Sequence, residues 1–366
     1  MNAEAKTPRP RRILHIGKYF PPHRGGMETV LRDQMNMQTR DEGLKVAAVV
    51  HSSNRRLTDT VEITELGYRV RHSGRWFTAI FTPIAPLFWL SLLREIRELD
   101  PEEIRIHMPN LSAFWLLLLP NARSRNWVVL WHSDVVASPR SWGLRSFYWL
   151  YRPLELAVLK RAREIIATSL PYLETSKPLE RFRQKSVVET LKLDAQRVPL
   201  WATSATQPAK GTVEEVRVLC VGRLTYYKDF GTAIQAVSLI PNAQLHIVGD
   251  GDEAEALKTL ASELGVSSRV TFFGAVSDDT LWREYIWCDF LCLPSVERTE
   301  AFGLVILEAA LFGKPCMVAN TAGSGMVSAA KASHAEYQVF EPRDHQGLAH
   351  IIAQSSTALN RPPPPR

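Results

Sequence analysis

Apolar residues in this chain form short continuous runs that alternate with stretches of helical periodicity, and the runs fall into two series. In the first series, the apolar runs predict buried strands at residues 12–17, 45–50, 104–107, 127–132 and 164–168. A turn at residues 21–26 follows the first of them, and an amphipathic helix is expected at residues 27–36. Strands and helices that alternate at this spacing predict a doubly wound parallel sheet.

The second series begins after a stretch at residues 198–211 that is rich in Ser, Thr, Ala, Pro and Gly and has no periodicity. It predicts strands at residues 216–221, 244–248, 269–273, 290–293 and 315–318, and helices at 230–240, 253–264, 278–287, 303–311 and 346–358. The chain is therefore expected to be α/β, with two Rossmann-like, doubly wound domains that face a central crevice at the carboxyl ends of both sheets. The expected divisions are a first domain (1–200), a linker (201–212), a second domain (213–358) and a Pro-rich tail (359–366).

The longest run without a charged residue covers residues 76–93 and reaches the length of a membrane span. Pro83 and Pro86 interrupt it, and Ser and Thr are scattered through it. A loop followed by a helix docked on the first domain is the preferred interpretation. A membrane-contacting face and a spanning helix are the alternatives.

Composition agrees with a globular protein of two domains: 366 residues, 45% hydrophobic and 22% charged. The N-terminus has no apolar segment typical of export, and the four cysteines lie inside apolar runs, so buried thiols in a cytoplasmic protein are expected. The net charge of +6 is compatible with nucleic acid, a diphosphate substrate or an anionic membrane. Since no nucleic-acid recognition module is visible, nucleic acid is the weakest of these partners.

The main candidate for chemistry lies between a predicted buried strand and an amphipathic helix, at residues 300–308. Phe302, Gly303 and Leu304 open the helix, and the unpaired N–H groups there suit a diphosphate. Glu308 lies roughly 6–7 Å further along the helix axis, about the distance from a diphosphate to a ribose, whose hydroxyls a carboxylate can bind. Glu300 precedes the helix and is placed to meet a sugar. The spacing alone equally allows a surface loop acid and a solvated helix acid.

Two cations and two glycines also follow predicted strands. Arg223 and Lys228 come after the strand at 216–221, where they could neutralise a leaving diphosphate. Gly25 and Gly26 come after the first strand, where backbone amides could approach a phosphate or sugar closely. Ordinary surface cations and a plain tight turn remain alternatives.

A histidine and an aspartate end the strand at 127–132. His132 could bond the donor sugar or its phosphate, and Asp134 could orient an acceptor hydroxyl. Two polar residues that merely end a strand are the alternative.

These motifs together resemble the family 4 glycosyltransferases of the GT-B fold, over nearly the whole chain. The motifs that carry the resemblance stand in the family's order at strand ends, and they are Gly25-Gly26, His107-Met-Pro-Asn110, Trp131-His-Ser-Asp134, Gly222-Arg-Leu-Thr-Tyr-Tyr-Lys228, Val248-Gly-Asp-Gly251, Phe273-Gly274 and Glu297-Arg-Thr-Glu-Ala-Phe-Gly-Leu-Val-Ile-Leu-Glu308.

The resemblance implies an acceptor-binding first domain, a nucleotide-sugar-binding second domain, and hexose transfer that retains the anomeric configuration without metal or other cofactor. It implies that Arg223 and Lys228 hold the diphosphate, that Glu308 binds the ribose, and that Glu300 binds the sugar. The remaining roles it implies are backbone contacts from Phe302, Gly303 and Leu304, a donor contact from His132, donor-side loops at Gly25, Gly26, Gly249 and Gly274, and acceptor-side contacts from Asp134 and Asn110.

The His-x-Pro-Asn and Trp-His-Ser-Asp motifs look like those of bacterial enzymes that build exopolysaccharide, capsule or lipopolysaccharide. Such enzymes use GDP-mannose or a UDP-hexose and a lipid-linked or saccharide acceptor. The stretch 140–163 mixes Arg and Lys with Trp, Tyr and Phe, which suits peripheral contact with an anionic membrane at the cytoplasmic face of the inner membrane. An ordinary helix face over an aromatic core is the alternative.

Two departures from the family pattern leave other functions open. Residues 326–334 replace an Asn- and Gly-rich loop, and the sequence stops soon after the helix expected at 346–358. A non-catalytic or impaired sugar-nucleotide-binding homologue is therefore the main alternative, ahead of a GT-B epimerase or phosphorylase.

Overall fold

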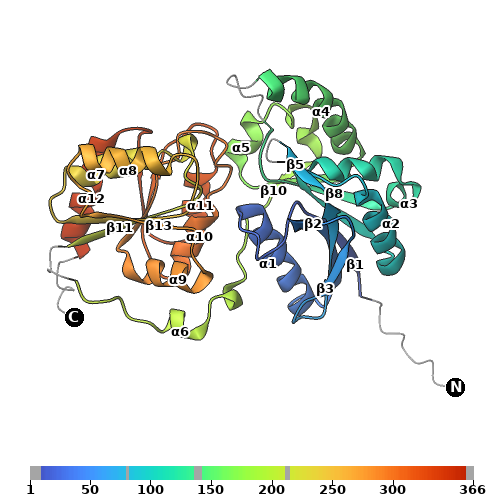
Figure 1. The fold of residues 1–366 in the computed structure, drawn as a ribbon, viewed down its shortest axis with the longest axis horizontal. Coiled ribbons are helices and arrows are strands. Elements are labelled where there is room, and N and C mark those ends of the chain that lie inside the picture. The colour runs from blue at the N-terminus through green and yellow to red at the C-terminus, as the bar shows by residue number, and fades with distance from the viewer. Residues whose placement is uncertain (1–9, 80–81, 136–141, 211–214, 360–366) are drawn as a thin grey trace. The chain divides into compact units, whose positions relative to one another are not determined.

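The computed structural model describes residues 10–79, 82–135, 142–210 and 215–359. Two compact units divide the chain: unit 1 comprises residues 1–168 and 175–194, and unit 2 comprises residues 169–174 and 195–366. The six residues 169–174 therefore belong to unit 2, although the residues on both sides of them belong to unit 1. Each unit is an open sheet with helices on both faces (Figure 1).

Unit 1 is built on an eight-stranded sheet in the order β10-β9-β8-β7-β1-β2-β4-β3. All of its neighbours pair in parallel except β3, which is antiparallel to β4. Its strands are β1 (Arg12–Ile16), β2 (Lys45–Arg55), β3 (Thr60–Ile63), β4 (Arg69–Arg75), β7 (Glu103–Met108), β8 (Asn126–Trp131), β9 (Glu164–Ala167) and β10 (Ser186–Val188).

The helices of unit 1 cover both faces of this sheet, with α1 and α2 on opposite sides (Figure 1). They are α1 (Gly26–Arg40), α2 (Phe88–Leu99), α3 (Pro120–Arg123) and α4 (Trp142–Arg161), with short 3-10 helices η1 (Leu111–Leu118) and η2 (Glu180–Lys185). A two-stranded hairpin, β5 (Phe77–Ala79) and β6 (Thr82–Ile84), precedes α2.

Unit 2 is built on a six-stranded, entirely parallel sheet in the order β13-β12-β11-β14-β15-β16. Its strands are β11 (Val216–Val221), β12 (Ala243–Val248), β13 (Val270–Gly274), β14 (Phe290–Leu293), β15 (Cys316–Ala319) and β16 (Tyr337–Phe340). β11 and β14 are completely buried, as expected of central strands covered on both faces.

The main helices of unit 2 follow these strands, with α7 and α8 on one face and α9 on the other (Figure 1). They are α7 (Phe230–Ser238), α8 (Ala254–Glu263), α9 (Asp278–Trp287), α10 (Leu304–Leu311), α11 (Met326–Ala332) and α12 (His345–Leu359). Shorter helices are α5 (Leu170–Thr175), whose last residue is assigned to unit 1, α6 (Leu200–Thr203), η3 (Ala195–Arg197) and η4 (Tyr226–Lys228).

The predicted fold class, two doubly wound α/β domains, is confirmed. The four cysteines are buried free thiols, as expected. Among the described residues of the apolar run at 76–93, 77–79 and 82–84 form the paired strands β5 and β6, and 88–93 begin α2. The expected helix is therefore confirmed, whereas the strands before it were expected as a loop. Among the described residues, no helix is both long and apolar enough to cross a membrane.

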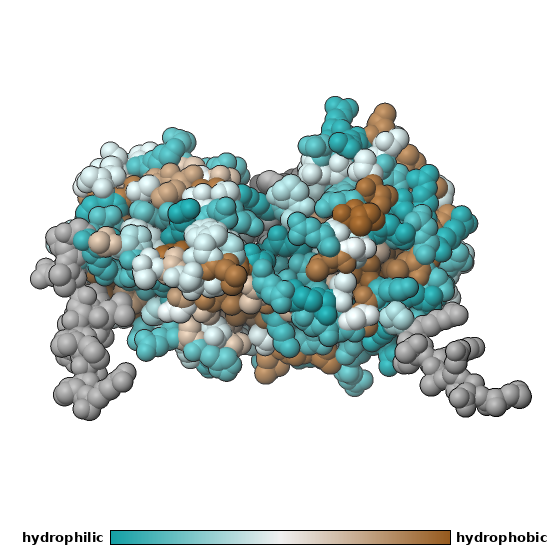
Figure 2. Space-filling model, turned by 90° about the horizontal axis from the view of Figure 1, so that it is seen from below, coloured by the Kyte–Doolittle hydropathy of each residue, from teal (hydrophilic) through white to brown (hydrophobic). Residues whose placement is uncertain are grey.

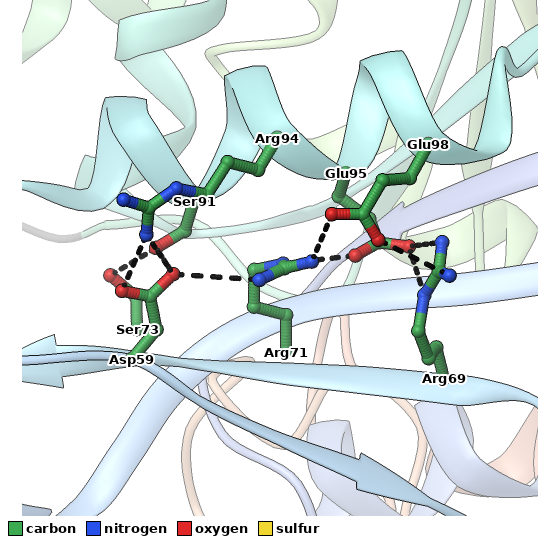
Figure 3. A network of polar contacts seen from close by, with 8 residues as sticks. All are labelled: Asp59, Arg69, Arg71, Ser73, Ser91, Arg94, Glu95 and Glu98. Atoms are coloured by element: carbon green, nitrogen blue, oxygen red, sulfur yellow. Dashed lines mark hydrogen bonds and ion pairs between the residues drawn. The ribbon is translucent and has the colours of Figure 1, made fainter.

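The strands β3, β4, β10 and β16 were not predicted because their sequences lack continuous apolar runs. β3 is exposed along its whole length, and β4 contains the buried Arg71. Figure 3 shows the reason: the Arg71 guanidinium lies between the carboxylates of Asp59, Glu95 and Glu98. An arginine paired in this way can occupy a position where a sequence pattern expects an aliphatic residue.

Candidate active site

The strand order of unit 2 marks the carboxyl ends of its two central strands as a candidate ligand site. Numbered along the unit, the order is 3-2-1-4-5-6, so the direction of connection reverses between β11 and β14. Ligands of doubly wound sheets bind at the carboxyl ends of the strands at such a switch point. The loops after these two strands carry Lys228 and Glu300, and their side chains meet in an ion pair of 2.5 Å.

Lys228 and Glu300 are both largely buried, so the pair is held in place rather than free in solvent. The loops that carry them are joined by a hydrogen bond of 2.8 Å from Val296 N to Tyr227 O. Arg223, on the same loop as Lys228, is exposed and makes no ion pair with any described residue. The sheet edge thus holds one anchored cation and one available cation.

Glycines let three strand-end loops pack backbone against backbone beside this pair. A Cβ atom at Gly249 would lie 1.9 Å from the carbonyl oxygen of Gly222, and one at Gly251 would lie 2.2 Å from that of Leu224. The Gly249 N–H donates to the Gly274 carbonyl at 2.9 Å. The structure therefore gives Gly249 a packing role, whereas Gly274 is open to a side chain and has left-handed backbone with φ of 65°. The predicted contacts of Gly249 and Gly274 with the donor stay predictions.

Helix α10 begins at this edge through a residue with left-handed backbone. Gly303 has φ of 82°, and a Cβ there would lie 2.9 Å from Leu293 Cδ2, so both the conformation and the space require glycine. Phe302 is buried in the core, so only backbone can reach a ligand at its position. Leu304 is the first residue of α10, whose opening N–H groups face the end of the sheet.

Glu308 is bound more fully by protein groups than the sequence predicts. Its carboxylate accepts hydrogen bonds from the Arg197 guanidinium and, at 2.7 Å, from the Tyr285 hydroxyl. Burial and the neighbouring Glu308 hold the pKa of Tyr285 well above its usual value, so the hydroxyl keeps its proton and donates. The Arg197 guanidinium also lies over the ring of Trp282, 5.1 Å from its centroid. A ribose that uses this carboxylate must share it with these groups or displace one of them.

Unit 1 has an equivalent switch point, between β1 and β7. The side chain of Asn110, after β7, donates to the Gly17 carbonyl, after β1, at 2.8 Å. Its oxygen accepts from the Ser112 N–H at 3.1 Å, so the buried Asn110 fastens two loops together. Asp134 is likewise buried and accepts from Trp131 Nε1 and the Ser176 hydroxyl. The predicted acceptor roles of Asn110 and Asp134 stay predictions beside these structural ones.

Three histidines cross this switch point in a row. His15 on β1 contacts His107 on β7, with 3.1 Å between Nδ1 and Nε2, and His107 Nδ1 lies 2.9 Å from Nε2 of His132 at the end of β8. At the far end, His15 Nε2 lies 2.8 Å from the amide oxygen of Gln38. Burial lowers the pKa of His15 to about 3 and that of His132 to about 4, so both rings are neutral at pH 7.

The glycine pair of unit 1 lies at the start of α1. A Cβ at Gly25 would lie 2.2 Å from a carboxylate oxygen of Glu28, whereas one at Gly26 would meet nothing within 4 Å. Gly25 thus leaves room for the buried Glu28 beside the helix start. Contact of either glycine with a donor stays a prediction.

Models of two glycosyltransferase families match the chain, one mainly in unit 1 and the other in unit 2. A family model described as "Glycosyltransferase Family 4" matches residues 24–175, and one described as "Glycosyl transferases group 1" matches residues 205–357. The chain is 31% identical over 321 residues to the D-rhamnosyltransferase WbpZ of Pseudomonas aeruginosa, a match that covers 86% of this chain and 78% of that protein. It belongs to the family 4 glycosyltransferases of the GT-B fold.

Two further comparisons extend over nearly the whole chain. The O-antigen chain mannosyltransferase C of Escherichia coli is 28% identical to this glycosyltransferase over 354 residues, which cover 93% of this chain and 87% of that protein. The structure of HepE from Anabaena in complex with UDP and glucose has a TM-score of 0.65 and 20% identity, and covers 95% of this chain and 94% of that chain. The latter likeness supports the GT-B fold.

The sequence predicted only part of the contacts at the two candidate sites. The structure brings Lys228 and Glu300 together, and it places His132 in a row of histidines whose other members were not predicted as functional. Arg197, the partner of Glu308, was also missed, because it lies next to the stretch interpreted as a linker. In the segment at 140–163, Trp149 is exposed and Tyr151 is buried, whereas Arg140 and the side chains of Trp142 and Phe147 lie outside the described residues.

Proposed function

We propose that this glycosyltransferase moves a hexose from a GDP- or UDP-sugar to a lipid-linked or saccharide acceptor in cell-surface polysaccharide synthesis. The Lys228–Glu300 pair at the switch point of unit 2 is the observation that carries the proposal. A lysine held beside a helix start, with the exposed Arg223 nearby, suits the two negative charges of a leaving nucleoside diphosphate. The UDP and glucose in the HepE complex, and the mannosyl and rhamnosyl transfer in the relatives' names, support this substrate class.

The proposed reaction retains the anomeric configuration and uses no metal ion. The bond from the anomeric carbon to the diphosphate oxygen breaks, and a bond to the acceptor oxygen forms on the same face of the sugar. The acceptor's proton passes to the departing phosphate oxygen, so atoms and charge balance without a protein nucleophile. Arg223 and Lys228 stabilise the negative charge that develops on that phosphate.

A panel of GDP- and UDP-sugars tests the donor class. A ligand that binds only the folded state raises the melting temperature, so one nucleotide sugar of the panel is expected to stabilise the protein more than free GDP or UDP does. Proton NMR of the product then gives the anomeric configuration. No stabilisation by any nucleotide sugar, or a product of inverted configuration, would contradict the proposal.

We propose that the acceptor is lipid-linked and is met at the cytoplasmic face of the inner membrane. An apolar groove in unit 1 supports the contact with lipid. The groove has a volume of about 450 Å³ and is lined by side chains that include Phe114, Trp115, Leu118 and Leu154. On α4 beside it, Trp149 is 80% exposed and Leu150 is 66% exposed. The face of the molecule drawn in Figure 2 instead shows apolar residues in small groups among hydrophilic ones.

Flotation with anionic liposomes tests this membrane contact. We expect the protein to float with vesicles that contain phosphatidylglycerol at low salt, and the double variant Trp149→Ser, Leu150→Ser to float several-fold less. Leu239→Ser, at a 53% exposed leucine of unit 2, is the matched control. If the native protein stays with the soluble fraction, the acceptor is reached without membrane contact.

A further inference from the structure

The row of histidines in unit 1 ends at His132, for which the family resemblance implies a contact with the donor sugar. Gln38, on α1, stands at one end, His15 and His107 lie between, and His132 stands at the other. Gln38, His15 and His107 are all almost completely buried, so bulk water does not replace any of their contacts. Each ring in the row therefore depends on its neighbour for its hydrogen bond.

The position of every proton in the row follows from the amide oxygen of Gln38. This oxygen can only accept, so His15 Nε2 carries a hydrogen. His15 is neutral, hence its Nδ1 has none and accepts from His107 Nε2. Burial likewise lowers the pKa of His107 well below its usual value, so His107 Nδ1 accepts from His132 Nε2.

The last ring is thereby left with a bare nitrogen at the end of the sheet. His132 carries its proton on Nε2, and its Nδ1 presents a lone pair. No described residue bonds that nitrogen. A lone pair attracts a hydroxyl hydrogen but repels the oxygens of a phosphate, which carry no proton at pH 7. The two roles that the sequence leaves open for His132, towards the sugar or towards its phosphate, are therefore not equivalent.

We propose that Gln38, acting through His15 and His107, fixes His132 as the Nε2–H tautomer, so that His132 Nδ1 accepts a hydrogen bond from a donor-sugar hydroxyl. Gln38, His15 and His107 are then positioning residues, and His132 selects donors that offer a hydroxyl at that position. The sugar contact rests on the proposed function, whereas the tautomer does not.

Nitrogen-15 NMR of histidine-labelled protein at pH 7 tests the tautomer without any ligand. In the native protein, His132 is expected to show a protonated Nε2 and an unprotonated Nδ1. Gln38→Met removes the acceptor at nearly constant volume, so both directions of the row become accessible and His132 should shift towards a mixture. Gln34→Met, one turn earlier on α1, is the matched control and should leave the signals of His132 unchanged.

The native spectrum alone can overturn the proposal, even if Gln38→Met does not fold. Protonation of His132 at Nδ1 would show that the row runs in the opposite direction. An unchanged spectrum in a folded Gln38→Met variant would show that Gln38 does not control the tautomer.

Donor analogues test the direction of the sugar contact. Deoxy and deoxyfluoro derivatives of GDP-mannose, or of the nucleotide sugar that the panel selects, are compared at each hydroxyl. For one hydroxyl, the deoxy donor should have a kcat/KM at least tenfold lower than that of the parent donor in the native enzyme. In His132→Ala, the deoxy and parent donors should have the same kcat/KM. The fluoro derivative there should be as poor as the deoxy one within twofold, because fluorine cannot donate a hydrogen bond.

A fluoro derivative that restores activity would mean that His132 donates, which contradicts the proposal. If no hydroxyl depends on His132, the sugar contact is wrong whatever the tautomer. Failure of every nucleotide sugar to bind would instead remove the proposed function, while the NMR result would still decide the tautomer.

Discussion

The two sheets of this glycosyltransferase have related strand orders, but the chemistry at their switch points is opposite. At the end of the unit 2 sheet stand charged groups, with Lys228 paired to Glu300 and Arg197 paired to Glu308. At the end of the unit 1 sheet stand His15, His107 and His132, which are joined to one another and neutral. The same topology thus gives each unit a candidate site, and the side chains decide its electrostatics.

The difference matches the parts of the substrate that each unit is proposed to meet. A diphosphate carries formal charge, so it is best met by cations and helix N–H groups. A sugar carries only hydroxyls, which hydrogen bonds of fixed direction distinguish well. A buried charge needs an opposite charge beside it, and a buried neutral ring needs a neighbour that completes its hydrogen bonds. Removal of one residue should therefore leave an unpaired charge in unit 2 but a broken row of hydrogen bonds in unit 1.

The largest effect is expected from Lys228→Ala. If Lys228 stabilises the leaving diphosphate as proposed, loss of its charge should lower kcat/KM about 100-fold. It also leaves Glu300 without its buried partner, so the melting temperature should fall. Steady-state kinetics and thermal unfolding measure both, with the exposed Lys258→Ala as control. Native-like kinetics in Lys228→Ala would remove the charged site from the mechanism.

Glu308→Ala is expected to have the next largest effect. Loss of the carboxylate should raise the KM for the nucleotide sugar at least tenfold if the carboxylate binds the ribose. Glu255→Ala, an exposed acid of α8, should leave KM unchanged. Arg197→Ala sharpens the result: a lower KM there would show that Arg197 competes with the ribose, and a higher KM would show that it positions Glu308.

Acid should destabilise the neutral region through its histidines. The pKa of His132 is about 4 in the folded protein because the ring is buried, so unfolding below pH 6.5 takes up a proton. The free energy of unfolding should therefore fall as pH falls, by about 1 kcal/mol between pH 6.5 and 5.5 for each such ring. Urea unfolding at pH 6.5 and 5.5 measures the slope, which His132→Asn should make shallower by about that amount. Equal slopes would show that the ring is protonated in the folded protein.

The smallest effect is expected from removing divalent metal. If Arg223 and Lys228 supply the positive charge at the leaving group, activity in EDTA should stay within twofold of the untreated enzyme. Complete loss in EDTA that magnesium or manganese restores would mean that a metal ion carries part of that charge.

The role of a residue could be predicted from the sequence where its contacts are with residues near it in the chain. The glycine at 303 and the helix after it could be predicted, because the strand before and the turn between them are encoded in adjacent residues. The roles of Gly249 and Gly251 could not, since the carbonyls that exclude a side chain there belong to residues 222 and 224. β4 was missed because Arg71 is neutralised by acids from two other segments.

The sequence by itself determined the two doubly wound domains, because periodicity and turn residues act over a few neighbouring positions. It also determined the family, because the motifs lie in a fixed order at strand ends. Only the tertiary structure decided that Lys228 meets Glu300, that Arg197 holds Glu308, and that three histidines form a row across β1, β7 and β8. In each case the partners are distant in sequence, and it is the parallel pairing of strands that brings their ends together.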